Sequence, residues 1–388
     1  MTCFEGATLI DGKGNSFVAN LLIEEDRILR ILKDEECPKD VETIDCKGKY
    51  ILPGLINSHV HICADPTKDF GDRPAFSDAK RAFIGLKNLQ SHLRAGITFV
   101  RDLGGYNFVE LELRDAIKNG DFQGAEMIGS GQCITMTGGH GWTHGREVDG
   151  VDEARKAARE QFKAGADLIK VMATGGVMTP GVEPGASQLC QEEMAAAIEE
   201  AKKRGAKSAT HAQGTQGIKN AILAGVDSIE HGIFLDDEVI SMMVERGVVL
   251  VPTLVAPYYI VQMGEEAGIP SYAVNKAKSI MEAHKESFRK AVEAGVKIAM
   301  GTDSGTPFNQ HGSVVQELIF MQRGGLSPME VLEAATYKAA ELLSIEKNYG
   351  SLEEGKRADF LILEQNPLED LRALETPTVY KKGKKVII

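Results

Sequence analysis

Five separate stretches of the chain each end an apolar run with a residue of a metal-ligand type. In chain order they are GLINSHVH with His59 and His61, ADLIKVMAT with Lys170, KSATHAQG with His211, VDSIEHG with His231, and VKIAMGTDSG with Asp303. Alternate side chains of a strand lie on the same face, so His59 and His61 can bind one ion together. In a parallel barrel the carboxyl ends of the strands hold the active site. Six such residues in this order predict a fold that gathers them at that end.

A pattern of helix, glycine and strand recurs through the middle of the chain, as in HLRAGITFVRD, QFKAGADLIKV and AVEAGVKIAMGTD. Glycine suits the left-handed end of a helix, and the β-branched run after it suits a buried parallel strand. The pattern predicts eight strands, near residues 51–61, 97–102, 126–130, 167–173, 207–211, 226–231, 248–253 and 296–303. Eight strands alternating with helices favour an α/β fold built on a (β/α)8 barrel. A doubly wound open sheet is the alternative, and it explains the spread of the ligand-type residues less well.

The two ends of the chain differ in pattern from the middle. Residues 1–50 contain short alternating runs separated by glycine-bearing turns, and the segments GSLEEGKRADFLILEQNP and PTVYKKGKKVII continue that style at the other end. Neither end has enough residues to bury a large core alone. We therefore predict one small β-sandwich-like domain formed by residues 1–52 together with 350–388, beside a barrel formed by residues 53–349.

Charge and composition exclude several classes of partner. The formal net charge of -12 argues against binding to nucleic acid phosphates or to an anionic membrane surface. The first residues lack a basic segment followed by an apolar one, so no signal peptide is expected. The six cysteines are scattered without a CxxC pair, which favours six reduced thiols in a cytoplasmic protein. The expected partner is a small molecule or a dipeptide, and a homo-oligomer is compatible with this composition.

The chain resembles the amidohydrolase superfamily over nearly its whole length. The motifs that carry the resemblance are PGLINSHVH at 53–61, the strand that contains Lys170, ATHAQG at 209–214, IEHG at 229–232 and GTDSGTP at 301–307. Within the superfamily the chain is most similar to the prolidase-like metal-dependent dipeptidases, through GGHG at 138–141, VPTLVAP at 251–257 and GSLEEGKRADF at 350–360. The resemblance implies a hydrolase that acts on C–N bonds and has a TIM barrel.

The resemblance also implies two divalent metal ions, with zinc as the expected metal. The ligands would be His59, His61 and Asp303 for the more buried ion, and His211 and His231 for the second. A lysine ammonium group has no lone pair to offer a metal. Lys170 would join the site after carbon dioxide converts it to a carbamate, whose two oxygens would bridge both ions. A salt bridge between Lys170 and Asp303 is the alternative role for this lysine.

Roles in catalysis follow from the same resemblance. A hydroxide shared by the two ions would attack the amide carbonyl, and Asp303 would take its proton and pass it to the leaving amine. His140, in a glycine-rich loop, is expected to act in catalysis and to contact the substrate at its scissile carbonyl or its carboxylate. His144 and Tyr258 are further predicted substrate contacts. The loop of residues 174–188 is rich in glycine and proline and is expected to cover the site.

One short segment departs from the family pattern. Related enzymes carry a tyrosine just after the His-Gly of the sixth strand, where it assists the carbonyl or the substrate. This chain has Ile233 and Phe234 there. Tyr258 or Tyr259, from the next loop, is the candidate replacement. The departure concerns recognition of the substrate more than the type of reaction.

The expected activity is hydrolysis of an amide or peptide bond next to a free carboxylate, in dipeptides such as Xaa-Pro or in N-acyl amino acids. A cyclic-amide hydrolase resembling imidazolonepropionase is the alternative enzyme. It would use one metal ion and no lysine, so Lys170 argues against it. A noncatalytic scaffold on the same fold is the rival from another class. Such proteins usually lose metal ligands, and this chain keeps all six.

Overall fold

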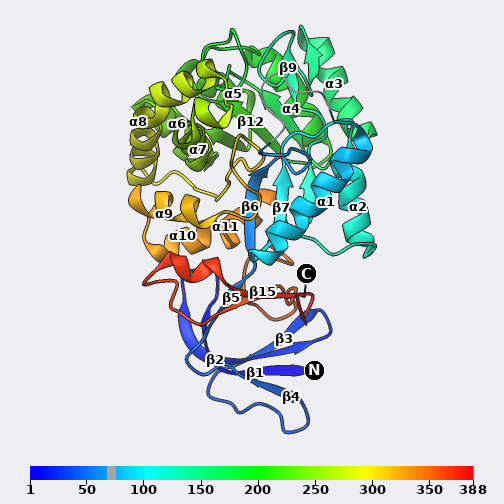
Figure 1. Cartoon of the computed structure of the whole chain (residues 1–388), viewed down its shortest axis with the longest axis vertical. Helices are drawn as coiled ribbons and strands as arrows, with labels where there is room; N and C mark the ends of the chain where they lie inside the picture. Colours follow the sequence, from blue (N-terminus) through cyan, green and yellow to red (C-terminus); the bar gives the residue numbers. More distant parts are fainter. Residues whose placement is uncertain (68–75, 388) are drawn as a thin grey trace.

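The computed structural model describes residues 1–67 and 76–387. It contains a TIM-barrel-like α/β body and, at one end of the molecule, an additional β-sheet that includes both chain termini (Figure 1). The body carries the residues predicted to bind metal. The extra sheet lies next to the amino end of β6, the strand that leads to His59.

Parallel strands form the inner part of the body in two hydrogen-bonded sheets. One sheet has the order β6 (Leu55–Val60), β7 (Ile97–Asp102) and β8 (Glu126–Gly129). The other has the order β10 (Arg146–Val148), β9 (Ile134–Met136), β11 (Ile169–Met172), β12 (Ser208–Ala212), β13 (Ser228–His231) and β14 (Val249–Val251). The first seven predicted strands are therefore confirmed, and β9 and β10 are short additions that the sequence pattern did not indicate.

The eighth predicted strand, residues 296–303, is not an assigned strand, yet its backbone connects the two sheets. The Leu250 amide donates to the Lys297 carbonyl at 2.8 Å, and the Ser58 amide donates to the Met300 carbonyl at 2.9 Å. Gly301 lies so close to β6 that an added Cβ would stand 2.9 Å from the His59 Cβ. The segment therefore lies between β14 and β6 and bonds to both, and a side chain larger than hydrogen at Gly301 would disturb His59.

Helices cover the outside of the strands (Figure 1). Their bounds are α1 (Asp78–Arg94), α2 (Val109–Asn119), α3 (Val151–Lys163), α4 (Gln191–Lys203), α5 (Thr215–Ala224), α6 (Asp237–Arg246), α7 (Val255–Met263), α8 (Ser271–Glu293), α9 (Val315–Arg323), α10 (Pro328–Ala334) and α11 (Tyr337–Leu343), with short 3-10 turns at Glu265–Ala267 and Leu371–Glu375. As the recurring pattern of helix, glycine and strand predicted, α5 and α6 end at a glycine in the left-handed conformation, and α2 ends in the same way. None of the described helices is long and apolar enough to cross a membrane.

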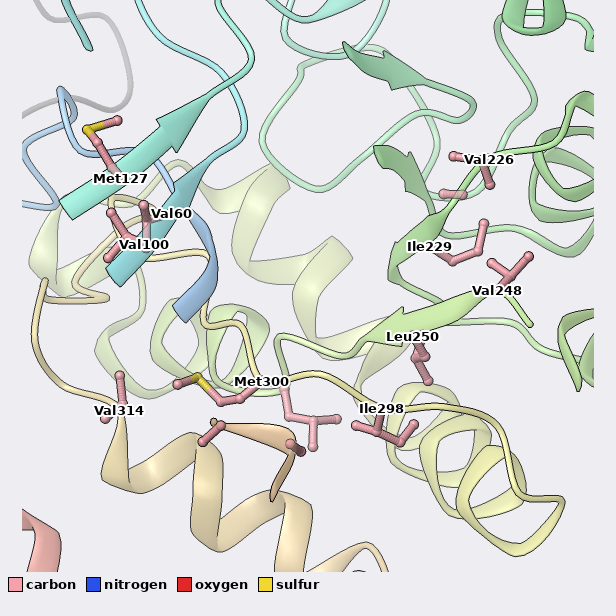
Figure 2. Close-up of a cluster of buried hydrophobic side chains, with 14 of the residues drawn as sticks. Val60, Val100, Met127, Val226, Ile229, Val248, Leu250, Ile298, Met300 and Val314 are labelled. Atoms are coloured by element: carbon pink, nitrogen blue, oxygen red, sulfur yellow. The ribbon is translucent and has the colours of Figure 1, made fainter. Parts of the chain in front are cut away.

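A continuous apolar core holds the strands to the helices. Figure 2 shows part of it, with side chains from β6, β7, β8, β13 and β14 and from the segment that contains Ile298 and Met300. Val60, Leu250 and Met300 in this group have no exposed surface. Because β-branched and long apolar side chains fill the space together, the strands and the 296–303 segment are held in fixed positions beneath the predicted site.

The extra sheet is built from both ends of the chain. Its strands follow the order β17 (Lys384–Lys385), β16 (Thr378–Lys381), β15 (Phe360–Leu363), β5 (Tyr50–Pro53), β1 (Thr2–Ile10), β2 (Ser16–Glu24) and β3 (Arg27–Leu32), and β4 (Glu42–Asp45) pairs with β1. β5 runs parallel to β1 and antiparallel to β15, so it joins the two ends. A separate apolar core holds this sheet together, and in it the ring centroids of Phe4, Phe360 and Tyr380 lie within 5.0 Å of one another. The boundaries 1–52 with 350–388 and 53–349, and the sandwich-like form, stay predictions.

The prediction of six reduced thiols is wrong for one pair. Cys3 in β1 and Cys37 after β3 form a disulfide, with Cα atoms 6.1 Å apart. They are 34 residues apart in sequence, and spacing alone did not show that the return of the chain past β2 brings them together. The remaining cysteines are free, three of them buried and Cys190 exposed.

Candidate active site

His59, His61 and Asp303 form the tightest group of ligand-type side chains in the described part of the chain. One donor atom from each lies within 4.8 Å of the others. Asp303 Oδ1 is 3.4 Å from His59 Nε2 and 3.2 Å from His61 Nε2. His59 is 1% exposed and Asp303 8%. This geometry suits one metal ion held by two imidazole nitrogens and a carboxylate oxygen.

His211 and His231 continue the group on one side. The His231 ring centroid is 5.3 Å from that of His59 and 4.5 Å from that of His211. His211 lies one residue before the end of β12 and His231 ends the neighbouring β13, so the parallel pairing of these strands brings the two rings close together. The four histidines and Asp303 therefore form one connected cluster, as the order of the motifs predicted.

Backbone strain marks three residues of this cluster and its surroundings. His231 has a φ of 74°, Asp303 a φ of 58° and Thr253 a φ of 51°. Residues other than glycine seldom adopt this left-handed conformation, and it tends to persist at functional sites where surrounding contacts enforce it. His231 and Asp303 are predicted metal ligands, and each has this conformation at the last residue of its segment, β13 or residues 296–303.

Burial keeps most of the histidines neutral. It lowers the pKa of His59 and His211 well below the usual value, and it lowers the pKa of His231 to about 3. Burial also opposes protonation of His61, but the hydrogen bond and the charge of Asp303 outweigh it and raise the pKa of His61. Neutral imidazole has the free nitrogen lone pair that a divalent metal needs.

Lys170 is 1% exposed on β11. Burial lowers its pKa, although the charges of Glu230 and Asp303 act in the opposite direction. For Asp303, burial would raise the pKa, but the nearby imidazole groups of His59 and His61, together with the hydrogen bond from His61, keep its pKa far below the usual range. The site thus contains the ionised carboxylate of Asp303 and the amine of Lys170, whose neutral form is favoured by burial.

The chain also holds the predicted ligand histidines from behind. In three of them Nδ1 is occupied by a protein acceptor, which leaves Nε2 available for a metal ion. These contacts are His59 with Glu230 Oε2 at 2.9 Å, His61 with the Gly104 carbonyl at 3.0 Å, and His231 with Thr253 Oγ1 at 2.7 Å. His211 uses Nε2 instead, 3.3 Å from the Gly175 carbonyl, so its Nδ1 is the available nitrogen. Side chains held in this way fit the divalent metal that the sequence motifs predicted.

Sequence reasoning missed several residues that hold the cluster. Glu230 and Arg101 contact each other and have almost no exposed surface. His284, on α8, places Nε2 3.0 Å from the His231 carbonyl and 2.8 Å from that of Pro252. The IEHG motif contained Glu230, but nothing in the sequence showed which side chain it would meet across the interior.

His140 lies beside His211, with ring centroids 4.1 Å apart. Its Nδ1 is 2.9 Å from Thr179 Oγ1, in the loop of residues 174–188, and its backbone amide donates to Gln188. At Gly176 an added Cβ would stand 2.5 Å from the His140 ring, so only glycine allows the loop to approach this closely. The 174–188 loop therefore packs against His140, as expected for a loop that covers the site.

The same loop is attached to α8. The Tyr272 hydroxyl donates to the Met178 carbonyl at 2.9 Å, and Lys276 Nζ donates to the Thr179 carbonyl at 2.8 Å. Val177 in the loop also packs in an apolar cluster with residues of α7 and α8. These contacts fix the loop at its centre, next to the residue that holds His140.

His144 and Tyr258, the two further predicted substrate contacts, have different ring neighbours in the structure. The His144 ring lies 6.5 Å from the His61 ring and 5.0 Å from the Tyr106 ring, measured between ring centroids. Tyr258 packs on Tyr259 and Phe320, and its described ring contacts do not include the histidines. Their roles in substrate binding stay predictions.

Ile233, which follows the His-Gly of β13, has an apolar role. It is 1% exposed and packs with Val177, Ile260 and Ile280. Phe234 is half-buried beside the same cluster, and its amide donates to the Gln213 carbonyl at 2.8 Å. The segment after β13 therefore contributes apolar contacts, and the structure places no hydroxyl group on the side chains of Ile233 and Phe234.

Glu110 predicts a dependence of stability on pH. Both of its carboxyl oxygens are buried and have no hydrogen-bond partner among the described residues, and its carboxyl group lies against Gly105. Burial, together with the charge of Asp102, raises its pKa from 4.5 to about 8. The native protein then binds more protons than the unfolded chain between these two values, so the free energy of unfolding falls as pH rises through that window.

Glu110→Gln removes this titration, so we expect the variant to lose less stability than the parent protein between pH 5 and pH 8. Denaturant unfolding at several pH values measures the difference. Glu112→Gln is the matched control, because Glu112 lies on the same helix and is exposed. Parallel pH profiles for the parent protein and Glu110→Gln would contradict the assignment.

Comparison with known proteins gives consistent matches over the whole chain. The profile of the Amidohydrolase family matches residues 50–386. A solved Xaa-Pro dipeptidase with methionine bound in its active site aligns with a TM-score of 0.93 at 34% identity and covers 99% of both chains. A prolidase complexed with N-methylphosphonate-L-proline aligns with a TM-score of 0.91 at 29% identity, again over 99% of both chains. The ochratoxinase of Aspergillus niger is 32% identical over 99% of this chain and 86% of the fungal protein.

Proposed function

This chain belongs to the amidohydrolase family and is a hydrolase of amide bonds, and we propose from that premise that it cleaves an amide or peptide bond next to a free carboxylate with the help of two zinc ions. The observation that carries the proposal is the cluster of His59, His61 and Asp303, continued by His211 and His231. A closed eight-stranded barrel, completed by residues 296–303, is part of the same proposal.

The residues that would hold the metal divide into two groups. His59, His61 and Asp303 would bind one ion, and His211 and His231 the other. The ions would supply a deprotonated water as the nucleophile near neutral pH. Lys170 would join both groups as a carbamate. Burial favours its neutral amine, which can add to carbon dioxide with release of one proton.

Asp303 is the proposed carrier of the proton. Its carboxylate is buried, ionised and directed at Nε2 of His59 and His61. It accepts the proton that the attacking water loses and gives it to the nitrogen of the scissile bond as that bond breaks. One water and one amide then give one carboxylic acid and one amine, which ionise to a carboxylate and an ammonium group, and no covalent bond to the protein forms.

His140 is the proposed donor to the scissile carbonyl. Burial lowers its pKa to about 3, so the ring is neutral. If the Thr179 hydroxyl donates to Nδ1, Nε2 carries the hydrogen and can donate to the carbonyl oxygen as negative charge develops on it. The 174–188 loop would exclude water from this contact, because it packs directly on the His140 ring.

The substrate class rests on the relatives. The solved dipeptidase holds methionine, and the solved prolidase holds a phosphonate derivative of proline. Methionine and this derivative of proline each contain an amino-acid carboxylate. We therefore propose that this chain takes Xaa-Pro dipeptides or N-acyl amino acids, with the carboxylate on the leaving-amine side of the scissile bond.

A substrate panel tests the proposed function. Protein loaded with zinc in bicarbonate buffer is assayed on Xaa-Pro dipeptides, N-acyl amino acids and the same compounds with the carboxylate converted to an amide. We expect hydrolysis of the free carboxylates, weaker hydrolysis of the amides and loss of activity with a chelator. Hydrolysis confined to cyclic amides, or full activity after the chelator treatment, would overturn the proposal.

His140→Ala separates two roles for this histidine. If His140 donates to the scissile carbonyl, we expect kcat and kcat/KM to fall together by roughly 100-fold or more, because the bond strengthens in the transition state. If His140 holds the substrate carboxylate, KM should rise while kcat changes little. Steady-state kinetics on a free-carboxylate substrate and its amide measure the difference.

The amide substrate provides the internal control. A carboxylate-binding role predicts that His140→Ala loses the preference for the free carboxylate over the amide. A carbonyl-binding role predicts that the preference survives while both rates fall. Equal kinetics for the variant and the parent protein on both substrates would remove His140 from the site.

A further inference from the structure

The four predicted histidine ligands differ in the protein group behind the ring. His61 and His211 contact backbone carbonyls, and His231 contacts a hydroxyl group. His59 alone among these four has a carboxylate behind it, because its Nδ1 lies 2.9 Å from Glu230 Oε2. An imidazole that donates to a carboxylate is a stronger metal ligand than one that donates to a neutral oxygen. The two predicted metal positions are therefore supported unequally.

Glu230 is held in one orientation. It has no exposed surface, and its Oε1 accepts from Ser228 Oγ at 2.6 Å and from Arg101 Nη2 at 2.9 Å. Its Oε2 is thereby directed at His59. Since Glu230 accepts from Nδ1, His59 carries its hydrogen there and presents the lone pair of Nε2 toward Asp303.

Arg101 supplies the opposite charge that a buried carboxylate needs. Its guanidinium group is 1% exposed and also donates from Nε to the Ser58 carbonyl at 2.6 Å and from Nη1 to Ser228 Oγ at 3.0 Å. Arg101 lies on β7 and Glu230 on β13, which belong to different sheets. The pair therefore spans the interior beneath His59, and each nitrogen of the guanidinium group and each oxygen of the carboxylate has a hydrogen-bond partner.

We propose that Arg101 and Glu230 form a positioning pair that strengthens His59 as a ligand and makes the position of His59, His61 and Asp303 the one that fills first. The pair touches neither the substrate nor the predicted ion and acts through His59. The inference rests on the proposed function, because it needs two metal positions. It adds an order of occupancy, in which the position of His211 and His231 fills second.

Metal titration of the chelator-treated protein tests this order. Zn²⁺ is added in bicarbonate buffer with a competing chelator, and calorimetry gives the affinity of each step. Co²⁺ is used in parallel, because its visible spectrum reports the coordination at each step. For the parent protein we expect two steps, the first tighter than the second.

Glu230→Gln keeps the size of the side chain and removes its charge. We expect this variant to weaken the first step about 10–100-fold, the usual effect of losing such a partner, and to leave the second step nearly unchanged. Thr253→Val is the matched variant, because Thr253 stands behind His231 in the same way. It should weaken the second step and spare the first.

A double variant separates positioning from simple stability. Glu230→Gln alone leaves Arg101 buried without its counter-charge, which destabilises the fold. Arg101→Met combined with Glu230→Gln removes both charges, so thermal stability should recover toward that of the parent protein. The first metal affinity should stay weak. Recovery of the affinity together with the stability would mean that the pair has a structural role only.

The outcomes distinguish this inference from the proposed function. A parent protein that binds no divalent metal would overturn both. Two metal ions in the parent protein, with an unchanged first step in Glu230→Gln, would overturn the order of occupancy and leave the metal site intact. Weakening of the first step by Thr253→Val to the same extent as by Glu230→Gln would also overturn the assignment.

Discussion

Replacing Asp303 by asparagine is expected to lower kcat by about 1,000-fold or more while the protein stays folded. The amide has nearly the same shape as the carboxylate, but it lacks the charge that holds a metal and the basicity that accepts a proton. Asp303 Oδ1 lies 3.4 Å from His59 Nε2 and 3.2 Å from His61 Nε2. The substitution therefore removes metal binding and proton transfer from the same carboxylate. Steady-state kinetics, metal analysis and a thermal melt together measure the effect.

Asp236→Asn provides the matched control for this substitution. Asp236 caps the start of α6 by accepting from the Val239 amide at 2.9 Å, and asparagine serves equally well at that position. We expect its kinetics to match those of the parent protein. An Asp303→Asn variant that kept a substantial fraction of kcat would exclude this residue as the proton carrier.

Lys170→Ala is expected to reduce the metal content from about two ions per chain to about one or fewer, with kcat lower by roughly 100-fold or more. The reason is that the variant cannot form the carbamate that would bridge the two groups of histidines. The parent protein should also load its metal more slowly when bicarbonate is absent. Metal analysis after gel filtration, with and without bicarbonate, gives both results.

Added propionate offers a direct check on the role of Lys170. A short carboxylate can occupy the space left by the lysine and supply two oxygen atoms in place of the carbamate, so it should restore part of the metal content and activity. Lys203→Ala, at an exposed position on α4, should behave like the parent protein. A Lys170→Ala variant with unchanged metal content and rate would rule out the bridging carbamate.

The sequence predicted the α/β body well because its signals are local. Each predicted strand up to residue 253 is a short apolar run, and several of these runs follow a helix-ending glycine. The structure has a strand at each of these places. Residues 296–303 were the exception. Gly301 and the positive φ of Asp303 interrupt regular pairing there, although the backbone still bonds to both neighbours. Hydrophobic pattern alone does not distinguish such a segment from a strand.

The candidate site also contains residues that local sequence signals predicted and residues that they did not. His59, His61, His211, His231 and Asp303 were predictable because each ends an apolar run. Arg101 and Glu230 were not, because their importance depends on a contact between strands that are far apart in sequence. The pairing of Cys3 with Cys37 was missed for a similar reason, since it depends on the path of the chain around β2. Contacts across the interior require the register of the whole fold, which no single motif contains.

The shared sheet at the chain ends has a consequence for synthesis on the ribosome. β1 to β5 are synthesised before the α/β body, but β5 obtains its second neighbour, β15, only after the entire α/β body has been translated. Until then the nascent chain exposes the backbone of β5 along one side, and an open strand edge invites pairing with other chains. Pairing of β15 with β5 is therefore a late step in the folding of the nascent chain. A translation product that stops before residue 360 leaves the edge of β5 open to aggregation.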